Sequence, residues 1–346
     1  MTLAEAKRGD ATSLTKKLRD FSEKYVKISN ENMTRTRKLV KDYIEDRIMA
    51  YCRQNSELPI LNLQYTGSVY ERLKTEAADE VDVMVVLKTS KPWFWGDPEV
   101  MKEETGFPGY VRLKATVDSK LRRYVSSEGY IIPGRLRERW FFSLVSRAVT
   151  DLRVNSPGSN LDFVVRQHGP SVQLDIFSKE TGWKLLSADL VPCFQIGTDE
   201  YFVAKQHTRD ERLWRRSFSL EEKQLLKRMD KDDHGCRHEL LRIVKTIVNK
   251  ERTSLGQLRS YYLKTAFMHY IKEKPSNWNG RNSLGEHFVG FLAALQAFLE
   301  KRNLPNYWLP EVNLLDEIPN PVVVGNMAYR LKRILNSEVE RNKILE

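Results

Sequence analysis

The chain has 346 residues, of which 41% are hydrophobic, so it is long enough to bury the cores of two lobes. Its 57 Lys and Arg against 46 Asp and Glu give a net charge of +11, which favours a polyanionic partner such as nucleic acid or a nucleotide; a basic surface that only aids solubility is the alternative. Its apolar runs fall far short of the ~20 residues that span a bilayer. The N-terminal segment lacks the apolar core of a signal peptide, and Cys52, Cys193 and Cys236 are too scattered for a disulfide framework. We therefore expect a cytoplasmic protein with no membrane partner.

The first part of the chain predicts helices and then strands. Val40, Ile44 and Ile48 recur at helical spacing and predict one long helix with Asn30 or Asn32 as its N-cap, preceded by a shorter helix over "SLTKKLRDFSEKYVKIS". "LNLQYTG" and "VDVMVVL" predict two strands, with room between them for a helical turn. A loop, "KPWFWGDPE", follows, and "YVRLKAT" and "PSVQLDIFS" predict further strands. Residues 1–205 are therefore expected to form an α/β lobe.

The second part of the chain predicts helices alone. "LEEKQLLKRM", "RHELLRIVKTIVNKER", "LRSYYLKTAFMHYI", "LGEHFVGFLAALQAFLEKRN" and "MAYRLKRILNSEVERNK" all have apolar residues at a period of 3.6. We expect an all-helical lobe over residues 206–346. The absence of a low-complexity linker indicates a packed junction between the lobes.

A glycine turn and three acidic residues carry the candidate chemistry. Gly67 and Ser68 follow a predicted strand, where backbone N–H groups and a hydroxyl can bind phosphates. Glu80 and Asp82 begin the next strand on one face, as two hard oxygen ligands for Mg²⁺. Asp175, in "PSVQLDIFS", is the expected third carboxylate, nearest the attacking sugar hydroxyl.

Each of these signals has an ordinary structural alternative. An E-x-D pair is usually a solvated strand edge, and a Gly-Ser pair alone is a weaker signal still. Their occurrence together and in this order favours a nucleotidyltransferase core, in which metal ions assist the in-line displacement of pyrophosphate.

Five ordered blocks resemble a known family. They are "GSVYERLKTEAADEVDVMVVL", "LWRRSFSLEEKQLL", "CRHELLRIVKTI", "LRSYYLKTAFMHY" and "LPNYWLPEVNLL", and together they run over nearly the whole chain. They resemble cyclic GMP-AMP synthase, its animal receptor-like relatives and the male-abnormal-type proteins. The resemblance implies an α/β nucleotidyltransferase fold similar to polymerase beta, with a mixed-sheet core, a long N-terminal spine helix and a C-terminal all-helical lobe.

The resemblance also implies roles for single residues. Glu80, Asp82 and Asp175 would be both the catalytic residues and the ligands of Mg²⁺ or Mn²⁺. ATP and GTP would be held by the following residues: Gly67, Ser68, Lys205, Arg215, Ser217, Lys245, Ser260 and Tyr261. An ammonium such as that of Lys245 neutralises phosphate charge, and a tyrosine face such as that of Tyr261 can stack on a base. Helix packing is the alternative for Tyr261.

The sequence departs from the vertebrate synthase at two places. The zinc-binding insertion before the "CRHELL" helix is missing, and His234, Cys236 and His238 lack the paired spacing of a zinc site, so no zinc is expected. The absence of this insertion shifts the expected activator from long duplex DNA toward double-stranded RNA. Arg259 stands where the synthase has a small serine beside the base, which leaves the product open.

Cations on the predicted N-terminal helices are candidate contacts for that activator. Those that we single out are Lys16, Lys17, Arg35, Lys38 and Lys41. A stripe of this kind binds the phosphates of an A-form duplex by shape, whereas a solvated helix face is the alternative. The resemblance also allows a homodimer assembled on nucleic acid.

Three functions remain in competition. The leading hypothesis is an innate immune sensor that, when activated by RNA, makes a cyclic dinucleotide such as cyclic GMP-AMP from ATP and GTP. The second is a catalytically silent male-abnormal-type protein that binds nucleotide or serves as a scaffold in development. The third is a template-independent polymerase that adds nucleotides to RNA ends.

Overall fold

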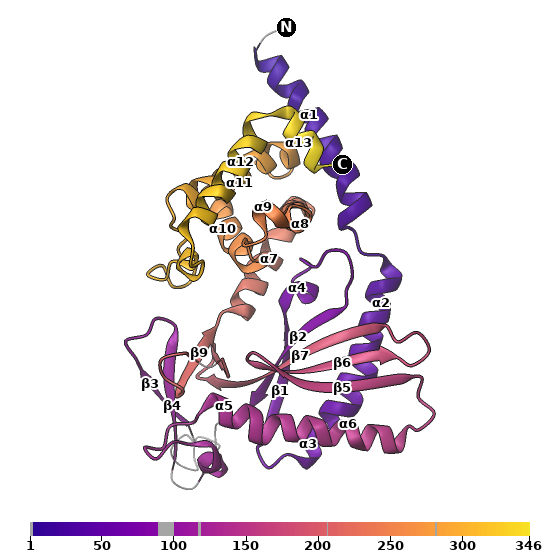
Figure 1. The fold of residues 1–346 in the computed structure, drawn as a ribbon, viewed down its shortest axis with the longest axis vertical. Coiled ribbons are helices and arrows are strands. Elements are labelled where there is room, and N and C mark those ends of the chain that lie inside the picture. The colour runs from indigo at the N-terminus through magenta and orange to yellow at the C-terminus, as the bar shows by residue number, and fades with distance from the viewer. Residues whose placement is uncertain (1–2, 89–99, 117–118, 206, 281) are drawn as a thin grey trace. The chain divides into compact units, whose positions relative to one another are not determined.

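A computed structural model describes residues 3–88, 100–116, 119–205, 207–280 and 282–346 (Figure 1). The chain divides into two compact units. The sheet unit comprises Ser29–Glu71 and Ala77–Lys223; the helical unit comprises the residues up to Ile28 together with Arg72–Glu76 and Gln224–Glu346. The sheet continues past residue 205, where we expected the lobe boundary, because the last strand of the sheet follows that residue. The predicted loop "KPWFWGDPE" lies outside the described residues.

The sheet unit joins helices to a mixed sheet. Its helices are α2 (Asn30–Leu39), η2 (Val40–Met49), α3 (Ala50–Asn55), α4 (Gly67–Tyr70), η4 (Lys120–Tyr124), α5 (Pro133–Arg135), η5 (Leu136–Phe142) and α6 (Ser143–Asn155). Its strands are β1 (Ile60–Thr66), β2 (Glu80–Leu87), β3 (Val100–Glu104), β4 (Tyr110–Ala115), β5 (Leu161–His168), β6 (Ser171–Ser178), β7 (Lys184–Ile196), β8 (Glu200–Val203) and β9 (Leu213–Ser217).

The predicted long helix is present as the continuous run of α2, η2 and α3, whose middle segment is wound as a π-helix. Ile44 and Ile48 are fully buried, as their spacing predicted. The N-cap is Ser29, whose side chain accepts a hydrogen bond from the backbone N–H of Asn32, so our assignment of the cap to Asn30 or Asn32 was wrong. The Asn32 side chain instead accepts a hydrogen bond of 2.9 Å from the backbone N–H of Ala78.

The sheet is mixed, and one parallel pair of strands lies at its centre. Among the described residues its strand order is β1-β2-β7-β8-β9-β4-β3, and β5 and β6 form a hairpin whose β6 strand also pairs with β7. Strands β2 and β7 run parallel, and the other pairs are antiparallel. Helix α6 packs against β5 and against the long helix (Figure 1). The predicted α/β class with a mixed sheet is confirmed.

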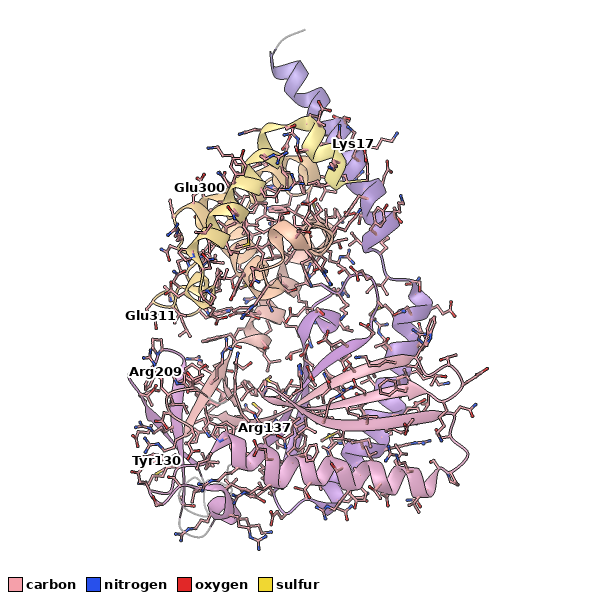
Figure 2. The ribbon with its side chains drawn as sticks, viewed as in Figure 1. Lys17, Tyr130, Arg137, Arg209, Glu300 and Glu311 are labelled. Atoms are coloured by element: carbon pink, nitrogen blue, oxygen red, sulfur yellow. The ribbon has the colours of Figure 1, made fainter. Side chains whose placement is uncertain are left out.

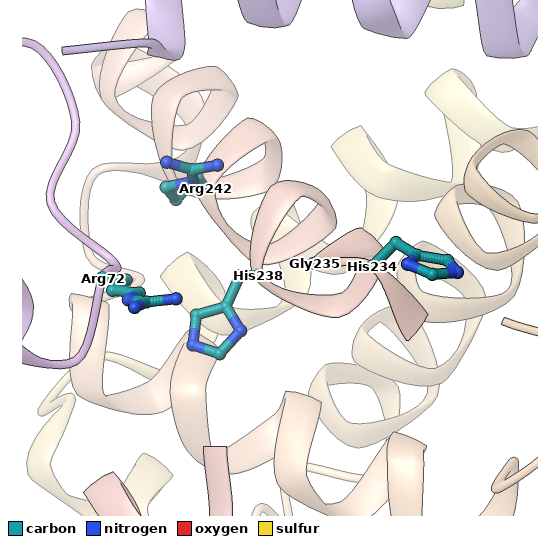
Figure 3. A pocket seen from close by; sticks show the side chains of 5 residues that line it. All are labelled: Arg72, His234, Gly235, His238 and Arg242. Carbon is teal, nitrogen blue, oxygen red and sulfur yellow. The ribbon is translucent and has the colours of Figure 1, made fainter. Parts of the chain in front are cut away.

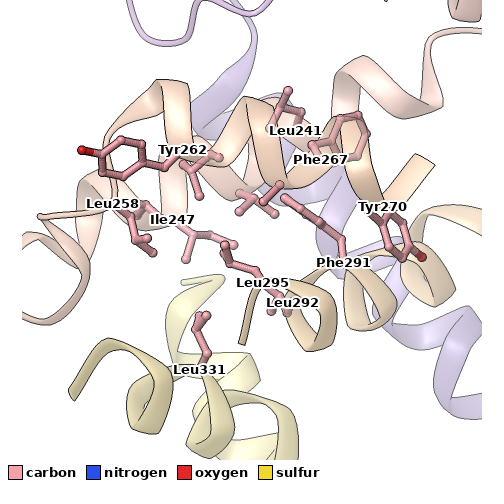
Figure 4. Close-up of a cluster of buried hydrophobic side chains, with 14 of the residues drawn as sticks. Leu241, Ile247, Leu258, Tyr262, Phe267, Tyr270, Phe291, Leu292, Leu295 and Leu331 are labelled. Atoms are coloured by element: carbon pink, nitrogen blue, oxygen red, sulfur yellow. The ribbon is translucent and has the colours of Figure 1, made fainter. Parts of the chain in front are cut away.

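The helical unit contains the predicted second-half helices. Its elements are α1 (Leu3–Phe21), η1 (Ser22–Val26), α7 (Ser219–Asp233), α8 (Cys236–Lys250), α9 (Arg252–Leu255), α10 (Ser260–Glu273), α11 (Ser283–Glu300), η6 (Leu314–Glu317), α12 (Pro321–Asn336) and α13 (Glu338–Ile344); the first turn of α7 belongs to the sheet unit. A single apolar core joins these helices (Figure 4). On α11, Phe288, Phe291 and Leu295 are fully buried at helical spacing, which explains the periodicity of the sequence.

Two general features of the chain follow from the structure. In the part of the chain that is described, no helix combines the length and the apolar character that crossing a bilayer requires. Cys52, Cys193 and Cys236 are all free thiols, and burial raises the pKa of the Cys52 and Cys236 thiols to about 12. They are therefore protonated and inert near neutral pH.

Candidate active site

A glycine turn joins β1 to the acidic strand β2. Gly67 begins α4 directly after β1 and has a φ of +77°, a conformation that L side chains rarely adopt. A Cβ atom at this position would lie 1.7 Å from Oδ2 of Asp82. Glycine is therefore required both by the backbone conformation and by the close approach of the Asp82 carboxylate.

The strand register brings acidic residues from two strands to one face of the sheet. Asp82 lies opposite Thr66 of β1 on one side and opposite Asp189 of β7 on the other. Glu80, two residues before Asp82, lies opposite Ser187 of β7. Residues paired across strands point to the same face, so Glu80, Asp82 and Asp189 share a face.

The start of β2 is anchored by hydrogen bonds on both sides. The Thr36 hydroxyl donates to the backbone carbonyl of Ala78, whose N–H is already held by Asn32. The Ser187 N–H donates to the carbonyl of Asp79 at 2.7 Å. Glu80 therefore begins a strand whose preceding residues are fixed.

Asp175 does not occupy the position that we expected for it. It lies on β6 opposite Ser187, so the whole of β7 separates it from β2. Its side chain is fully buried, and it accepts hydrogen bonds from the Ser187 hydroxyl and the Arg166 guanidinium, with the Lys184 ammonium at 3.7 Å. Burial alone would raise the pKa of this carboxyl, but these partners lower it. Protein groups therefore compensate the Asp175 charge without a metal.

Asp189 stands where we expected Asp175. It neighbours Asp82 on the parallel strand, and its side chain is 14% exposed, whereas that of Asp175 is 0% exposed. Oδ1 of Asp189 accepts hydrogen bonds from the Ser171 hydroxyl at 3.0 Å and from the Gln173 amide at 3.2 Å. Our sequence reasoning missed this residue.

The donor set fits a hard divalent cation. Glu80, Asp82 and Asp189 offer only carboxylate oxygens on one face, which is the ligand chemistry that Mg²⁺ and Mn²⁺ prefer. As they stand, no three His, Cys, Asp or Glu side chains of the described residues converge closely enough to hold a metal. Metal binding would therefore include rotation of at least one carboxylate side chain.

Besides Gly67 and Ser68, the predicted nucleotide contacts of the sheet unit lie on β9 and just after β8. Arg215 pairs with Val203 of β8 and with Tyr110 of β4, and its side chain is half-buried. The Ser217 hydroxyl is 3.1 Å from that of Ser219. Lys205 is exposed, and its backbone N–H donates to Val203. Arg215 and Ser217 are two residues apart on one strand and therefore share a face.

The remaining predicted nucleotide contacts belong to the helical unit. The Lys245 side chain is buried on α8, and its ammonium donates to the backbone carbonyl of Leu73 at 2.7 Å. Ser260 begins α10 and is exposed. The Tyr261 ring is half-buried and its hydroxyl accepts a hydrogen bond from Asn306, whereas Tyr262 is 1% exposed and belongs to the core. Of the two tyrosines, Tyr261 is thus the one with a surface to offer a base.

The predicted nucleic-acid contacts are divided between the two units. Arg35, Lys38 and Lys41 are exposed and follow one another at a spacing of three along α2 and η2, which forms a basic stripe. In the helical unit, Lys16 is exposed on α1. Lys17 (Figure 2) donates to the Asn342 side chain at 2.9 Å and is therefore partly committed to packing.

A cationic pocket in the helical unit was not predicted. It has a volume of about 250 Å³ and is lined by Arg72, His234, Gly235, His238 and Arg242, none of which is acidic (Figure 3). His238 and Arg242 lie one turn apart on α8, and the Arg72 and His238 side chains point toward one another. Arg72 and His234 both have positive φ, at 58° and 52°, a strained conformation that is enriched at functional sites. The pocket has the chemistry of an anion site.

Comparisons with known proteins agree with this architecture. Residues 69–228 match the Mab-21 protein nucleotidyltransferase domain, and residues 236–333 match the Mab-21 protein HhH/H2TH-like domain. The chain is 53% identical to the cyclic GMP-AMP synthase-like receptor 3 of Stylophora pistillata, over 97% of this chain and 99% of that protein.

More distant relatives share most of the same length. A cyclic GMP-AMP synthase-like receptor of Tribolium castaneum is 24% identical over 94% of this chain and 88% of its own length. The mitochondrial dynamics protein MID51 of Danio rerio is 26% identical over 92% of this chain and 68% of its own length. The chain therefore belongs to the Mab-21 nucleotidyltransferase family and, within it, to the cyclic GMP-AMP synthase-like receptors.

Proposed function

We propose that this protein is an innate immune sensor in the cytoplasm that joins ATP and GTP into a cyclic dinucleotide when double-stranded RNA binds to it. The observation that carries the proposal is the register of Asp82 with Asp189, beside Glu80 and next to a turn that only glycine can form. The similarity to a cyclic GMP-AMP synthase-like receptor over almost the full chain supports it.

The proposed catalytic residues and metal ligands are Glu80, Asp82 and Asp189, with Asp189 in place of Asp175. When bound there, Mg²⁺ or Mn²⁺ would neutralise charge on the triphosphate and make the attacking hydroxyl more acidic. The three carboxylates would hold and orient the reacting groups from one face of the sheet. Asp175, whose charge is balanced by its own partners, would support the fold and not the reaction.

The Gly67 turn is the proposed phosphate contact. Without a side chain at Gly67, the backbone can approach a triphosphate closely while Asp82 lies against the same turn. The Ser68 hydroxyl and the backbone N–H groups of the turn would donate hydrogen bonds to phosphate oxygens.

The other proposed nucleotide contacts keep the roles that the family resemblance implies. Lys205, Arg215 and Ser217 would line the pocket for the acceptor base from the sheet unit. In the helical unit, Tyr261 would stack on a base, with Ser260 beside it at the start of α10. Lys245 would exchange its bond to the Leu73 carbonyl for one to a phosphate.

The proposed activator is a nucleic acid recognised through its phosphates. Arg72 and Arg242 of the pocket and the stripe of Arg35, Lys38 and Lys41 supply cations that can bind phosphates of any sequence. Helix α8 begins three residues after α7 ends, which leaves no room for an insertion there. This short connection favours recognition of RNA over the recognition of DNA by which the vertebrate synthase is activated.

Product analysis tests this proposal. The purified chain would be incubated with radiolabelled ATP and GTP and with Mg²⁺ or Mn²⁺, in the presence of duplex RNA, duplex DNA or no nucleic acid. Thin-layer chromatography should show a phosphatase-resistant small product only with RNA. A product with DNA alone would contradict the proposed activator, and extended RNA of mixed length would indicate a polymerase.

A catalytically silent nucleotide-binding or scaffold protein is the second candidate. Two observations favour it: the carboxylates do not converge as they stand, and a family relative is named for mitochondrial dynamics. Nucleotide binding measured by calorimetry, without any product under all of the conditions above, would establish it.

A further inference from the structure

The β5–β6 hairpin supports Asp189 from the strand next to β7. Gln173 of β6 lies opposite Asp189 of β7, and Asp189 lies opposite Asp82 of β2, so the three residues form one row across the sheet. The buried Ser171 hydroxyl is 3.0 Å from Oδ1 of Asp189, and the Gln173 amide nitrogen is 3.2 Å from the same oxygen. Nδ1 of His168, at the end of β5, lies farther away, at 3.7 Å from the same oxygen.

These contacts act on one oxygen of the carboxylate. The Gln173 amide N–H can only donate a hydrogen bond. The Ser171 hydroxyl lies within hydrogen-bond distance of both Oδ1 of Asp189, at 3.0 Å, and the His168 carbonyl, at 2.8 Å. All of the hydrogen bonds given above for Asp189 go to Oδ1. The hairpin therefore fixes the side-chain rotamer and leaves Oδ2 as the oxygen that a ligand can use.

We propose that Gln173, assisted by Ser171, is a positioning residue that holds Asp189 ready to bind the metal. This inference rests on the proposed function, because it gives Gln173 a role only if Asp189 is a metal ligand. In this proposal Gln173 acts on the metal site through its hydrogen bond to Asp189; its amide nitrogen also lies 3.5 Å from Nδ1 of His168. Hydrogen bonds to a ligating carboxylate orient it, so that less conformational freedom is lost when the metal binds.

Loss of such an outer contact typically weakens metal affinity by roughly 10- to 100-fold. We expect Gln173→Met, which keeps the side-chain volume and removes the donor, to weaken Mn²⁺ binding about 10-fold. Saturating Mn²⁺ should restore kcat, because the ligands themselves are unchanged. Ser171→Ala should act in the same direction but less strongly, since the Ser171 hydroxyl is closer to the His168 carbonyl, at 2.8 Å, than to Asp189, whereas the Gln173 amide is closer to Asp189 than to His168. A merely structural role would lower kcat and Tm together, and metal would restore neither.

The full chain is titrated with Mn²⁺ in the presence of a non-hydrolysable ATP analogue, and electron paramagnetic resonance measures how much Mn²⁺ is bound. The titration compares the wild type, Gln173→Met, Asp189→Asn and a matched control, Gln167→Met, an exposed glutamine on β5. Thermal unfolding of each variant checks its fold. The expected order of affinity is wild type equal to Gln167→Met, then Gln173→Met, then Asp189→Asn.

The outcomes separate this inference from the function on which it rests. If Asp189→Asn binds Mn²⁺ as the wild type does, both the proposed metal site and the role of Gln173 fail. If Asp189→Asn weakens binding but Gln173→Met does not, only the role of Gln173 fails. Equal weakening by Gln167→Met and Gln173→Met would also overturn it, since the effect would then not depend on contact with Asp189.

Discussion

Asp82 and Asp189 occupy neighbouring positions on the parallel strands β2 and β7. Neighbouring strands are about 5 Å apart, and two unit charges at that distance repel by roughly 3 kcal/mol at an effective dielectric constant of 20. A pair of carboxylates in this arrangement is stabilised by a cation. The same repulsion therefore favours binding of a metal ion by the two carboxylates.

Gly67→Ala should destabilise the sheet unit and abolish activity. A Cβ atom at this φ costs about 1–2 kcal/mol, and it would also overlap Oδ2 of Asp82 and displace that carboxylate. Urea unfolding and the product assay would measure the two effects. Gly182→Ala is the matched control, because Gly182 has a φ of +70° and nothing within 4 Å of a new Cβ. Gly182→Ala should lose stability through the backbone strain but keep activity. Equal activity of Gly67→Ala and Gly182→Ala would contradict the account of the turn.

Asp175→Asn should lower stability in a manner that depends on pH. Its partners lower the pKa of Asp175 in the folded state, so its contribution is present above the unfolded pKa of about 3.9. Near neutral pH the substitution should cost about 1–3 kcal/mol of the free energy of unfolding. The difference from the wild type should shrink as the pH falls below about 4 and the wild-type carboxylate becomes protonated. A difference that stays constant from pH 7 to below about 3 would show that the charge contributes nothing.

Arg72→Ala and Arg242→Ala should each weaken binding of duplex RNA. If each guanidinium binds one phosphate, each substitution should also reduce the slope of log affinity against log salt by roughly 1. Fluorescence anisotropy with a labelled duplex at several salt concentrations measures both quantities. Arg252→Ala, on an exposed position of α9, is the control. An unchanged salt slope in the two pocket variants would remove the pocket from the RNA surface.

The basic residues of the N-terminal helices should differ in their effects. Lys38→Ala should weaken RNA binding, because Lys38 is exposed in the middle of the stripe on α2. Lys17→Ala should weaken it less, since its ammonium already donates to Asn342. The same anisotropy titration compares the two variants, and a larger loss for Lys17→Ala would reverse our assignment.

The sequence predicted the helices and the acidic strand well, because their patterns are local. The long helix and α11 have apolar residues at helical spacing, and each buries that face. The strand β2 is a short apolar run that begins with the acidic pair. The N-cap was misplaced by one position or more because Ser29, Asn30 and Asn32 are all good capping residues.

The sequence did not point to Asp189, our proposed third carboxylate, because β7 does not look like a central strand. Pro192 interrupts its apolar run, and proline is rare in central strands since it has no N–H to donate. Here the Pro192 carbonyl still accepts a hydrogen bond, from Ala204 at 3.1 Å, and the strand continues. The overlooked signal was the alternation of Leu186, Ala188 and Leu190, all fully buried, because it places Asp189 on the opposite face of β7.

The cationic pocket was beyond sequence reasoning for a different reason. Arg72 is far along the chain from His238 and Arg242, and the segment Arg72–Glu76 joins the helical unit although it lies between two strands of the sheet unit. Nothing in the local pattern indicates that change of unit. Only the tertiary structure brings the two arginines and the histidine together.

The most direct test of the central claim compares Asp189→Asn with Asp175→Asn in the product assay with ATP, GTP, Mn²⁺ and duplex RNA. Loss of an outer contact to a metal ligand already costs 10- to 100-fold, so loss of the ligand itself should lower the rate by more than about 100-fold. Asp175→Asn should retain activity within about threefold at a temperature where it is folded, since a structural residue does not stabilise the transition state. Full activity in Asp189→Asn together with loss in folded Asp175→Asn would show that the catalytic carboxylate is Asp175 and would contradict this account of the site.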